Sequence, residues 1–264
     1  AVAPGYKADL AVFDDLRTLN VKQVYKGGKL VAENGKMLHQ KEKNTDWSTE
    51  IKERVFHSFH RVPITVEELQ LKETTGTHQR VIDMVAHELI TKERIEEWKE
   101  LPGVAPGVDI SRDIVKLAAI ERHKNTGHVG LGFLGKYGLK KGAVATSIGH
   151  DSHNLVIAGV TDEDMVLAGN RVIENGGGLA IALEGKVLAD LPLPIGGLMA
   201  DEPVEVVDEK LEHMKKLSVE LGISEDIDAF MTLAFISLPV IPKLRLKTYG
   251  VIDVEKHQVV EARF

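Results

Sequence analysis

The sequence predicts a mixed α/β fold of the α+β type, in which a short β segment precedes a layered α/β domain. Apolar, β-branched runs at 143–148, 155–160 and 179–183 are typical of buried strands. Amphipathic stretches that begin at Thr161 and Pro203 predict two helices among these strands. Several predicted strands follow one another through short turns, which favours antiparallel pairing.

The first 38 residues predict a small β unit. A strand is expected at 8–13, and a hairpin at 21–32 turns at Gly27-Gly28, whose glycines supply the positive φ of a type I′ turn. The unit has too few apolar positions for its own core, so we expect residues 1–38 to pack on another body. Because the chain starts at Ala1 with neither Met nor a signal segment, we expect a truncated or processed chain.

Residues 39–60 are mostly polar and charged and predict a linker with a short helix at 48–56. The remaining residues, 61–264, predict the larger α/β domain. Within it, a strand is expected at 79–86, and alternation of apolar and polar residues at 110–120 predicts a half-buried strand.

Later segments complete the predicted domain. Six glycines between 127 and 142 indicate a bent strand or tight loop whose backbone approaches another group closely. Thr161 is expected to cap a helix, with Asp164 as the acidic half of a capping box. The last strands are expected at 231–237 and 244–253.

Composition excludes several classes of function. The formal net charge of -7 and the pI near 5.9 disfavour binding to nucleic acid. No apolar run approaches the roughly 20 residues that span a bilayer, so we expect no membrane partner and a cytoplasmic protein. With no cysteine among 264 residues, a metal would have to be held by His, Asp, Glu or backbone oxygen.

The densest polar cluster lies between two predicted buried strands and contains His150, Asp151, His153 and Asn154. Two imidazoles three residues apart could converge on a divalent ion or a ligand, with Asp151 orienting a ring or accepting a proton. The alternative is a hydrogen-bonded turn, with the histidines packed at a domain edge. No third metal ligand is adjacent in sequence, so metal binding by His150 and His153 is the less favoured of the functional interpretations.

Arg122 and His123 follow a predicted strand and could meet the His150 cluster at one sheet edge, where they would bind substrate. A solvated basic turn is the alternative, and the sequence favours it. The segment 191–199 is apolar and could form an interface or pocket wall, although a buried core loop is the simpler interpretation. His57 and His60 are expected to belong to a packed helix face.

Two groups of motifs resemble a known family. The first segment, Gly5–Asp14 with Val24–Val31, resembles the tail of amidohydrolase-superfamily enzymes, which closes a small β-sandwich after a (β/α)₈ barrel. Downstream segments resemble the adenine deaminase C-terminal domain: Glu121-Arg122-His123, 138–143, 147–154, Asn170-Arg171, Gly176-Gly177-Gly178, 191–199 and 230–233. The resemblance covers nearly the whole chain and is weakest at about 38–52.

This resemblance implies hydrolysis of adenine to hypoxanthine and ammonia by a metal-activated hydroxide. The family's metal, expected to be Mn²⁺ or Fe²⁺, is held on barrel strands that this chain does not contain, so no catalytic residue is assigned here and the chain alone is expected to be inactive. The His150–Asn154 cluster would then either reach over the mouth of the barrel or close a contact between subunits, and it would help to enclose the substrate. We also expect a homo-oligomer.

Two alternatives remain open. One is a noncatalytic domain that holds subunits together and covers the active site, supported by the apolar segment 191–199 and the β unit at 1–38. The other is a dihydroorotase-like or imidazolonepropionase-like amidohydrolase, since the tail alone does not separate these enzymes. The domain after residue 60 argues against this second alternative, because those relatives usually end soon after the tail.

Overall fold

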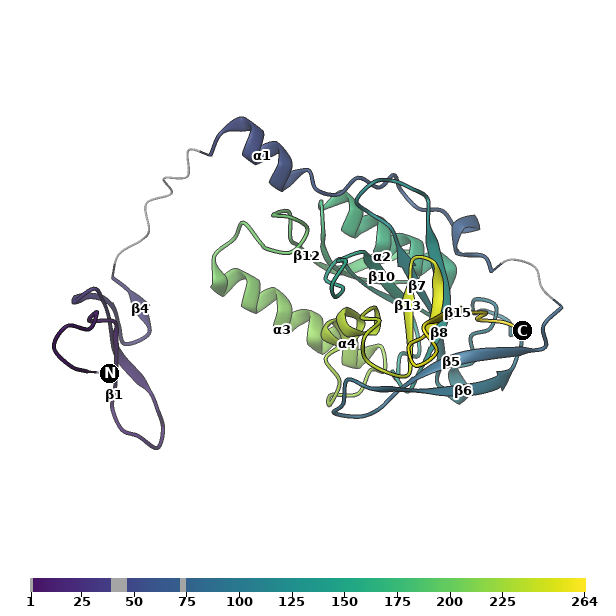
Figure 1. The fold of residues 1–264 in the computed structure, drawn as a ribbon, viewed down its shortest axis with the longest axis horizontal. Helices are drawn as coiled ribbons and strands as arrows, with labels where there is room; N and C mark the ends of the chain where they lie inside the picture. Colours follow the sequence, from purple (N-terminus) through teal and green to yellow (C-terminus); the bar gives the residue numbers. More distant parts are fainter. Residues whose placement is uncertain (1, 39–46, 72–74) are drawn as a thin grey trace. The chain divides into compact units, whose positions relative to one another are not determined.

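The computed structural model describes residues 2–38, 47–71 and 75–264. The chain divides into two compact units, Ala1–Trp47 and Ser48–Phe264. Most of the polar part of the predicted linker, 39–46, lies outside the described residues, and the short helix predicted after it is α1 (Thr49–Phe56), which begins after the Ser48 side-chain cap. The fold is mixed, with both helices and extensive sheets, as predicted (Figure 1).

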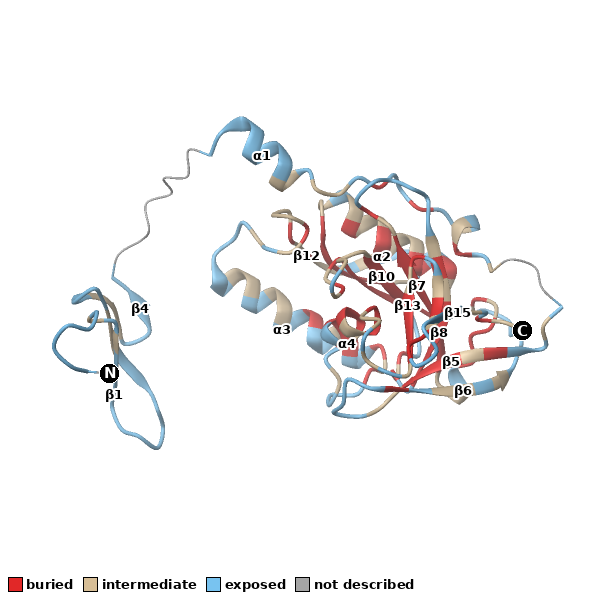
Figure 2. Ribbon diagram, viewed as in Figure 1, coloured by how far each residue is buried: buried red, intermediate tan, exposed pale blue. Residues whose placement is uncertain are grey.

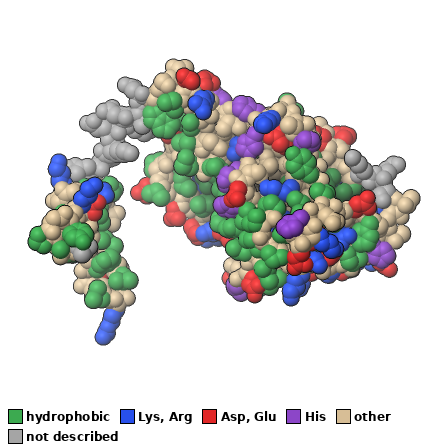
Figure 3. All heavy atoms as spheres, in the orientation of Figure 1, with side chains coloured by type: hydrophobic (Ala, Val, Ile, Leu, Met, Phe, Trp, Pro, Cys, Tyr) green, Lys and Arg blue, Asp and Glu red, His purple; other side chains and the backbone are tan. Residues whose placement is uncertain are grey.

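The first unit is a four-stranded antiparallel meander. Its strands are β1 (Leu10–Phe13), β2 (Val21–Lys26), β3 (Lys29–Glu33) and β4 (Lys36–Met37), paired in chain order. Gly27 and Gly28 both have positive φ, at 55° and 76°, as the predicted type I′ turn requires. None of residues 2–38 is buried, and Figure 3 shows hydrophobic side chains at the surface of this unit. The unit therefore has no core of its own.

The second unit is built on an eight-stranded sheet with the order β12-β11-β9-β10-β7-β8-β5-β6. Only β5 and β8 pair in parallel among the assigned neighbours of this sheet, so the predicted antiparallel bias is confirmed. The strands are β5 (His78–Met84), β6 (Thr91–Glu97), β7 (Ile114–Ile120), β8 (Val129–Gly135), β9 (Ala143–Thr146), β10 (Leu155–Gly159), β11 (Gly178–Leu183) and β12 (Lys186–Pro192).

Both faces of this sheet are covered, as Figure 2 shows by its buried central strands. Alternate side chains of one strand enter different cores because successive residues point to opposite faces. Ile157 packs with α2 (Asp162–Glu174), whereas Val156 and Ala158 pack in the core on the other face. That second core is covered by α3 (Val204–Glu220), α4 (Ala229–Ile236) and a small antiparallel sheet of β13 (Leu244–Lys247), β14 (Gly250–Asp253) and β15 (Gln258–Val260).

Several local predictions are confirmed by particular contacts. Thr161 Oγ1 accepts a hydrogen bond from Asp164 N at 3.3 Å, which is the N-terminal half of the predicted capping box. Gly130 shows why the glycine-rich segment needs glycine, since a Cβ there would lie 1.8 Å from Lys247 O. In the apolar segment 191–199, Leu191 and Leu193 are buried in the core, whereas Met199 is 60% exposed, so the interpretation as a buried core loop holds only for the first part of the segment.

Other local predictions were wrong. Residues 231–237 form most of helix α4 and not a strand, because Asp228 accepts hydrogen bonds from Phe230 N and Met231 N and starts a helix there. The Asp164 carboxylate does not complete the capping box; it accepts hydrogen bonds from Glu184 N and Gly185 N instead. Residues 244–253 form two strands of a hairpin.

The strand predicted at 110–120 begins later and is more deeply buried than expected. Ile110–Arg112 is a short 3-10 helix capped by the Asp109 side chain, and β7 follows it. Every residue of β7 is buried, including Lys116, whose Nζ donates to the Asp162 carboxylate at 2.6 Å. The alternating polar residue therefore indicated a buried ion pair and not a solvent-facing strand face.

Candidate functional site

The His150 loop, defined as residues 149–154, joins β9 to β10 and is anchored on helix α4. His150 N donates to Ala234 O at 2.8 Å, and Ser237 Oγ donates to His150 O at 3.1 Å. The His150 ring stacks on the Phe235 ring, with centroids 4.8 Å apart and planes 28° apart. The end of α4 thus holds both the backbone and the ring of His150.

Arg122 ties this loop to two other segments. It follows β7, is 1% exposed, and donates from Nε to His153 O at 2.5 Å and from Nη2 to Gly196 O at 3.0 Å. Nη1 makes a longer contact of 3.4 Å with Ser58 O, and the guanidinium lies 4.9 Å from the centre of the Phe59 ring. Burial lowers the pKa of Arg122 to about 10, although the nearby Glu121 carboxylate opposes this shift. Since all three nitrogens donate to carbonyls of the chain, Arg122 positions the loop.

His123 also reaches the His150 loop, which the sequence allowed but did not favour over a solvated basic turn. Its Nε2 lies 2.6 Å from Ser152 O, so this nitrogen carries the proton and donates. The turn that presents His123 is held by Glu121, whose carboxylate accepts hydrogen bonds from His123 N, Lys124 N and Thr126 N at 2.6, 2.9 and 3.0 Å. Although burial opposes it, this set of donors lowers the pKa of Glu121 to about 2.

His153 is held as a neutral ring. It has a φ of 47°, and its Nδ1 accepts a hydrogen bond from Gly149 N at 3.3 Å. Burial is the main cause that lowers the pKa of His153, and the nearby His150 ring and Arg122 guanidinium act in the same direction. Because Nδ1 accepts, the neutral ring carries its proton on Nε2. This atom is a hydrogen-bond donor suited to an acceptor atom of a ligand.

The remaining loop residues divide between exposed and buried positions. The Asp151 side chain is 86% exposed, and its carboxylate lies 3.6 Å from His150 Nδ1. Ser152 Oγ accepts from Lys247 Nζ at 3.0 Å and from Asn154 Nδ2 at 3.2 Å. Asn154 Oδ1 is buried without a hydrogen-bond partner. Burial lowers the pKa of Lys247, and the Asp151 charge partly opposes this.

The structure therefore brings together most of the residues that the sequence singled out. His150, Asp151, His153 and Asn154 share one loop, and Arg122 and His123 contact its backbone. Sequence reasoning missed Phe235, Ser237 and Lys247, which lie on the C-terminal side of α4 and on β13. Nothing local marks these three residues, since their role depends on the packing of distant segments. His57 lies elsewhere, with its Nδ1 2.7 Å from Glu53 Oε2, and its side chain is largely exposed.

The described residues do not by themselves fit a metal centre. No group of three or more His, Cys, Asp or Glu side chains that could hold a metal ion occurs within 2–38, 47–71 and 75–264. His150 and His153 have ring centroids 5.5 Å apart, but Nδ1 of His153 is already used by a backbone N–H. Metal binding by these two histidines stays a prediction that would need ligands from outside this group.

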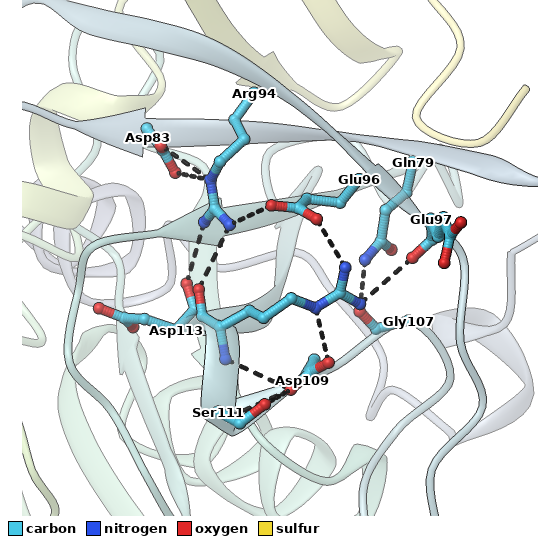
Figure 4. Close-up of polar contacts among 10 residues, drawn as sticks. Gln79, Asp83, Arg94, Glu96, Glu97, Gly107, Asp109, Ser111 and Asp113 are labelled. Atoms are coloured by element: carbon cyan, nitrogen blue, oxygen red, sulfur yellow. Dashed lines mark hydrogen bonds and ion pairs between the residues drawn. The ribbon is translucent and has the colours of Figure 1, made fainter.

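A second polar cluster, drawn in Figure 4, is closed on itself. Arg94 Nε contacts both oxygens of Asp83 at 3.0 and 2.9 Å, and its Nη1 donates to Glu96 at 2.8 Å. Arg112 bridges Glu96 at 2.6 Å and Asp109 at 2.7 Å. The two arginines and their carboxylates satisfy one another, so this network fastens edge strand β6 to the 109–113 segment, although Gln79 Oε1 beside it is buried without a hydrogen-bond partner.

Comparison with known proteins identifies the family of the chain. The family model described as the adenine deaminase C-terminal domain matches residues 88–258, which include the His150 loop, Arg122 and His123. The chain belongs to this adenine deaminase family. It is 44% identical to "Adenine deaminase 2" of Carboxydothermus hydrogenoformans and 40% identical to an adenine deaminase of Lysinibacillus sphaericus, each over 98% of this chain.

The match covers less than half of these relatives. The aligned region is 44% of the length of each of these two adenine deaminases and of a third one, from Petrotoga mobilis, that is 42% identical to the chain. The chain therefore corresponds to a portion of a longer family member. No helix among the described residues is long and apolar enough to cross a membrane.

Proposed function

We propose that this chain serves as the C-terminal portion of an enzyme that hydrolyses adenine to hypoxanthine and ammonia. The observation that carries the proposal is the family match, together with relatives that bear the name adenine deaminase over nearly all of this chain. In this reaction water adds to the amino-bearing ring carbon, and the amino group leaves as ammonia. Substrate, reaction and a cytoplasmic location all belong to the proposal.

The catalytic metal belongs to the part of the enzyme that precedes this segment in the family. A metal-activated hydroxide is the nucleophile that the resemblance implies, with Mn²⁺ or Fe²⁺ expected in the barrel. The described residues of this chain contain no group of three or more side chains that could hold a metal ion. The chain alone is expected not to deaminate adenine.

Within the complete enzyme, we propose that the His150 loop helps to enclose the substrate. The support is its construction: Arg122, His123 and helix α4 hold its backbone and Lys247 holds the Ser152 hydroxyl, whereas Asp151 and part of His150 stay exposed. A loop held this firmly presents its side chains with little loss of conformational entropy on binding. The neutral His153 ring adds a donor for a ring nitrogen or carbonyl acceptor.

The test is kinetic and uses the complete enzyme. His150→Ala with His153→Ala is expected to raise the KM for adenine with the metal content unchanged, and His213→Ala, which alters an exposed histidine on α3, is the control. Unchanged kinetics in the double variant would remove the loop from substrate binding. In a separate assay with added Mn²⁺, adenine turnover by the 264-residue chain alone would show that the catalytic part of the proposal is wrong.

Assembly is the second candidate function, and the first unit favours it. Val12, Phe13 and Val21 on its strands are about 40% exposed, as a meander that packs on another body would show. In the complete enzyme, replacing these three residues by Thr is expected to weaken subunit or domain association. Light scattering after size-exclusion chromatography measures this, and an unchanged mass with unchanged thermal stability would argue against it.

A further inference from the structure

A cavity of about 250 Å³ lies between residues 84–91, which end β5 and lead into β6, and residues 226–236, which contain α4. Its wall is largely apolar and includes Val85, Leu89, Ile90, Ile227, Met231 and Phe235. The volume is many times the roughly 10–15 Å³ that holds one water molecule and is below the roughly 300–1,000 Å³ of sites for drug-sized ligands. A small ligand fits it.

Arg245 of β13 contributes a buried cation to this wall. The residue is 1% exposed, and its Nη2 donates to the carbonyls of Leu89 and Pro242. Its Nε is buried without a hydrogen-bond partner, and no ion pair among the described residues includes Arg245. Burial alone lowers the pKa of Arg245 to about 10, with no opposing contribution from a carboxylate.

The comparison with Arg122 shows what is missing at Arg245. Both guanidinium groups are 1% exposed, but all three nitrogens of Arg122 have acceptors, whereas Arg245 has an acceptor at Nη2 only. A buried cation is costly unless acceptors surround it. The planar guanidinium matches a carboxylate, which accepts two parallel hydrogen bonds.

The other charged groups around the cavity are His87, Glu88, Asp226 and Asp228. Asp228 is engaged as the cap of α4, accepting hydrogen bonds from Phe230 N and Met231 N at 3.1 and 2.9 Å. The carboxylates carry the opposite charge to Arg245 but do not pair with it. A ligand with an ammonium group next to its carboxylate would satisfy both kinds of group, and a simple carboxylate would satisfy Arg245.

We propose that this cavity binds a small organic carboxylate with an apolar body, the carboxylate accepting hydrogen bonds from Arg245 and the body packing on Met231 and Phe235. Free carboxylic acids and amino acids share this chemistry. The site is separate from the His150 loop but adjoins it, since the Phe235 ring that lines the cavity also stacks on His150.

In the test, the 264-residue chain is titrated with 3-phenylpropionate, L-phenylalanine and 3-phenyl-1-propanol. Binding is measured by calorimetry and by the NMR shifts of the amide groups of residues 84–91 and 226–236. Saturable binding of either carboxylate, at least about tenfold tighter than the neutral alcohol, is expected from a charge-assisted pair. Binding of phenylpropionate alone indicates a free acid, and tighter binding of phenylalanine indicates an amino acid. Absence of saturable binding by both would overturn the proposal, as would equal binding of the alcohol.

Variants separate the site from general stability. Arg245→Met is expected to weaken carboxylate binding at least about tenfold, and Arg171→Met, which removes a partly exposed arginine from α2, should leave binding unchanged. Because loss of Arg245 could unfold the chain, Thr232→Trp provides a second variant that fills the cavity from α4 and keeps Arg245 in the chain. Undiminished binding in a folded Thr232→Trp variant would place the ligand elsewhere and refute the inference.

Discussion

Replacing Arg122 by Met is expected to destabilise the second unit and release the His150 loop. The substitution keeps an apolar chain of similar length but removes the donors to three backbone carbonyls in three separate segments. It also removes the guanidinium above the Phe59 ring, 4.9 Å from its centre. Because the carbonyl of His153 accepts one of these hydrogen bonds, the substitution should increase the mobility of the loop most.

The expected magnitude follows from the two shorter contacts, 2.5 Å to His153 O and 3.0 Å to Gly196 O. Each carbonyl left without a donor costs about 1–3 kcal/mol when buried, and the 3.4 Å contact with Ser58 O adds little. Loss of the contact with the Phe59 ring costs about 0.5–1 kcal/mol. These ranges sum to about 2.5–7 kcal/mol, and because His153 and Gly196 are only half-buried we expect the free energy of unfolding to fall by about 3 kcal/mol.

Urea denaturation followed by circular dichroism measures the stability, and amide hydrogen exchange of residues 149–154 measures the loop. Arg122→Lys should recover only part of the loss, because an ammonium group cannot match three divergent carbonyls as the planar guanidinium does. Arg171→Met is the matched control, since its side chain is 39% exposed. A loss below about 0.5 kcal/mol for Arg122→Met, a change typical of surface sites, with unchanged loop exchange, would refute this account of Arg122.

Two further predictions concern carboxylates. The pKa of Glu121 is lowered to about 2 in the folded chain, so its stabilising effect is complete above the usual pKa near 4.5 and is lost as the pH falls toward 2. The free energy of unfolding should therefore fall less steeply with decreasing pH in Glu121→Gln than in the unmodified chain. Parallel curves of this free energy against pH would contradict the prediction. The hydrogen bond from Arg94 lowers the pKa of Glu96; burial opposes this shift and Arg112 aids it. Glu96→Gln should therefore lower the melting temperature at neutral pH, and the difference in melting temperature between variant and unmodified chain should become smaller in acid. Calorimetry at two pH values measures both differences. Equal melting-temperature differences at both pH values would contradict the second prediction.

Helix α4 shows where sequence reasoning failed for a physical reason. Seven of its eight residues are apolar, and a run of this length reads equally as a buried strand or a buried helix. The local signal that decides between them is Asp228, whose side chain caps the helix. The error mattered for the site, because the same helix carries Phe235 and the carbonyl of Ala234 that anchor His150.

Residues close in sequence were easier to place. The Gly27-Gly28 turn, the Thr161 cap and the polar loop between β9 and β10 depend on local hydrogen bonds and φ preferences, which a few neighbouring residues determine. The sequence favoured a solvated basic turn for Arg122 and His123, and this was wrong for the buried Arg122. Both residues meet the His150 loop, the less favoured interpretation, because they lie just beyond the end of β7, which pairs antiparallel with β10.

The sequence by itself determined the α+β class, the antiparallel bias, the family and the loop that carries the histidines. Only the tertiary structure decided that Arg122 is a buried clamp, that Lys116 faces Asp162, and that Arg245 lies in a cavity wall with an unpaired Nε. The physical reason is that a charged side chain looks the same in sequence whether water or protein surrounds it. Its partners can come from distant segments, as Leu89 does for Arg245 from 156 residues away, and they exist only after the sheets and helices have packed.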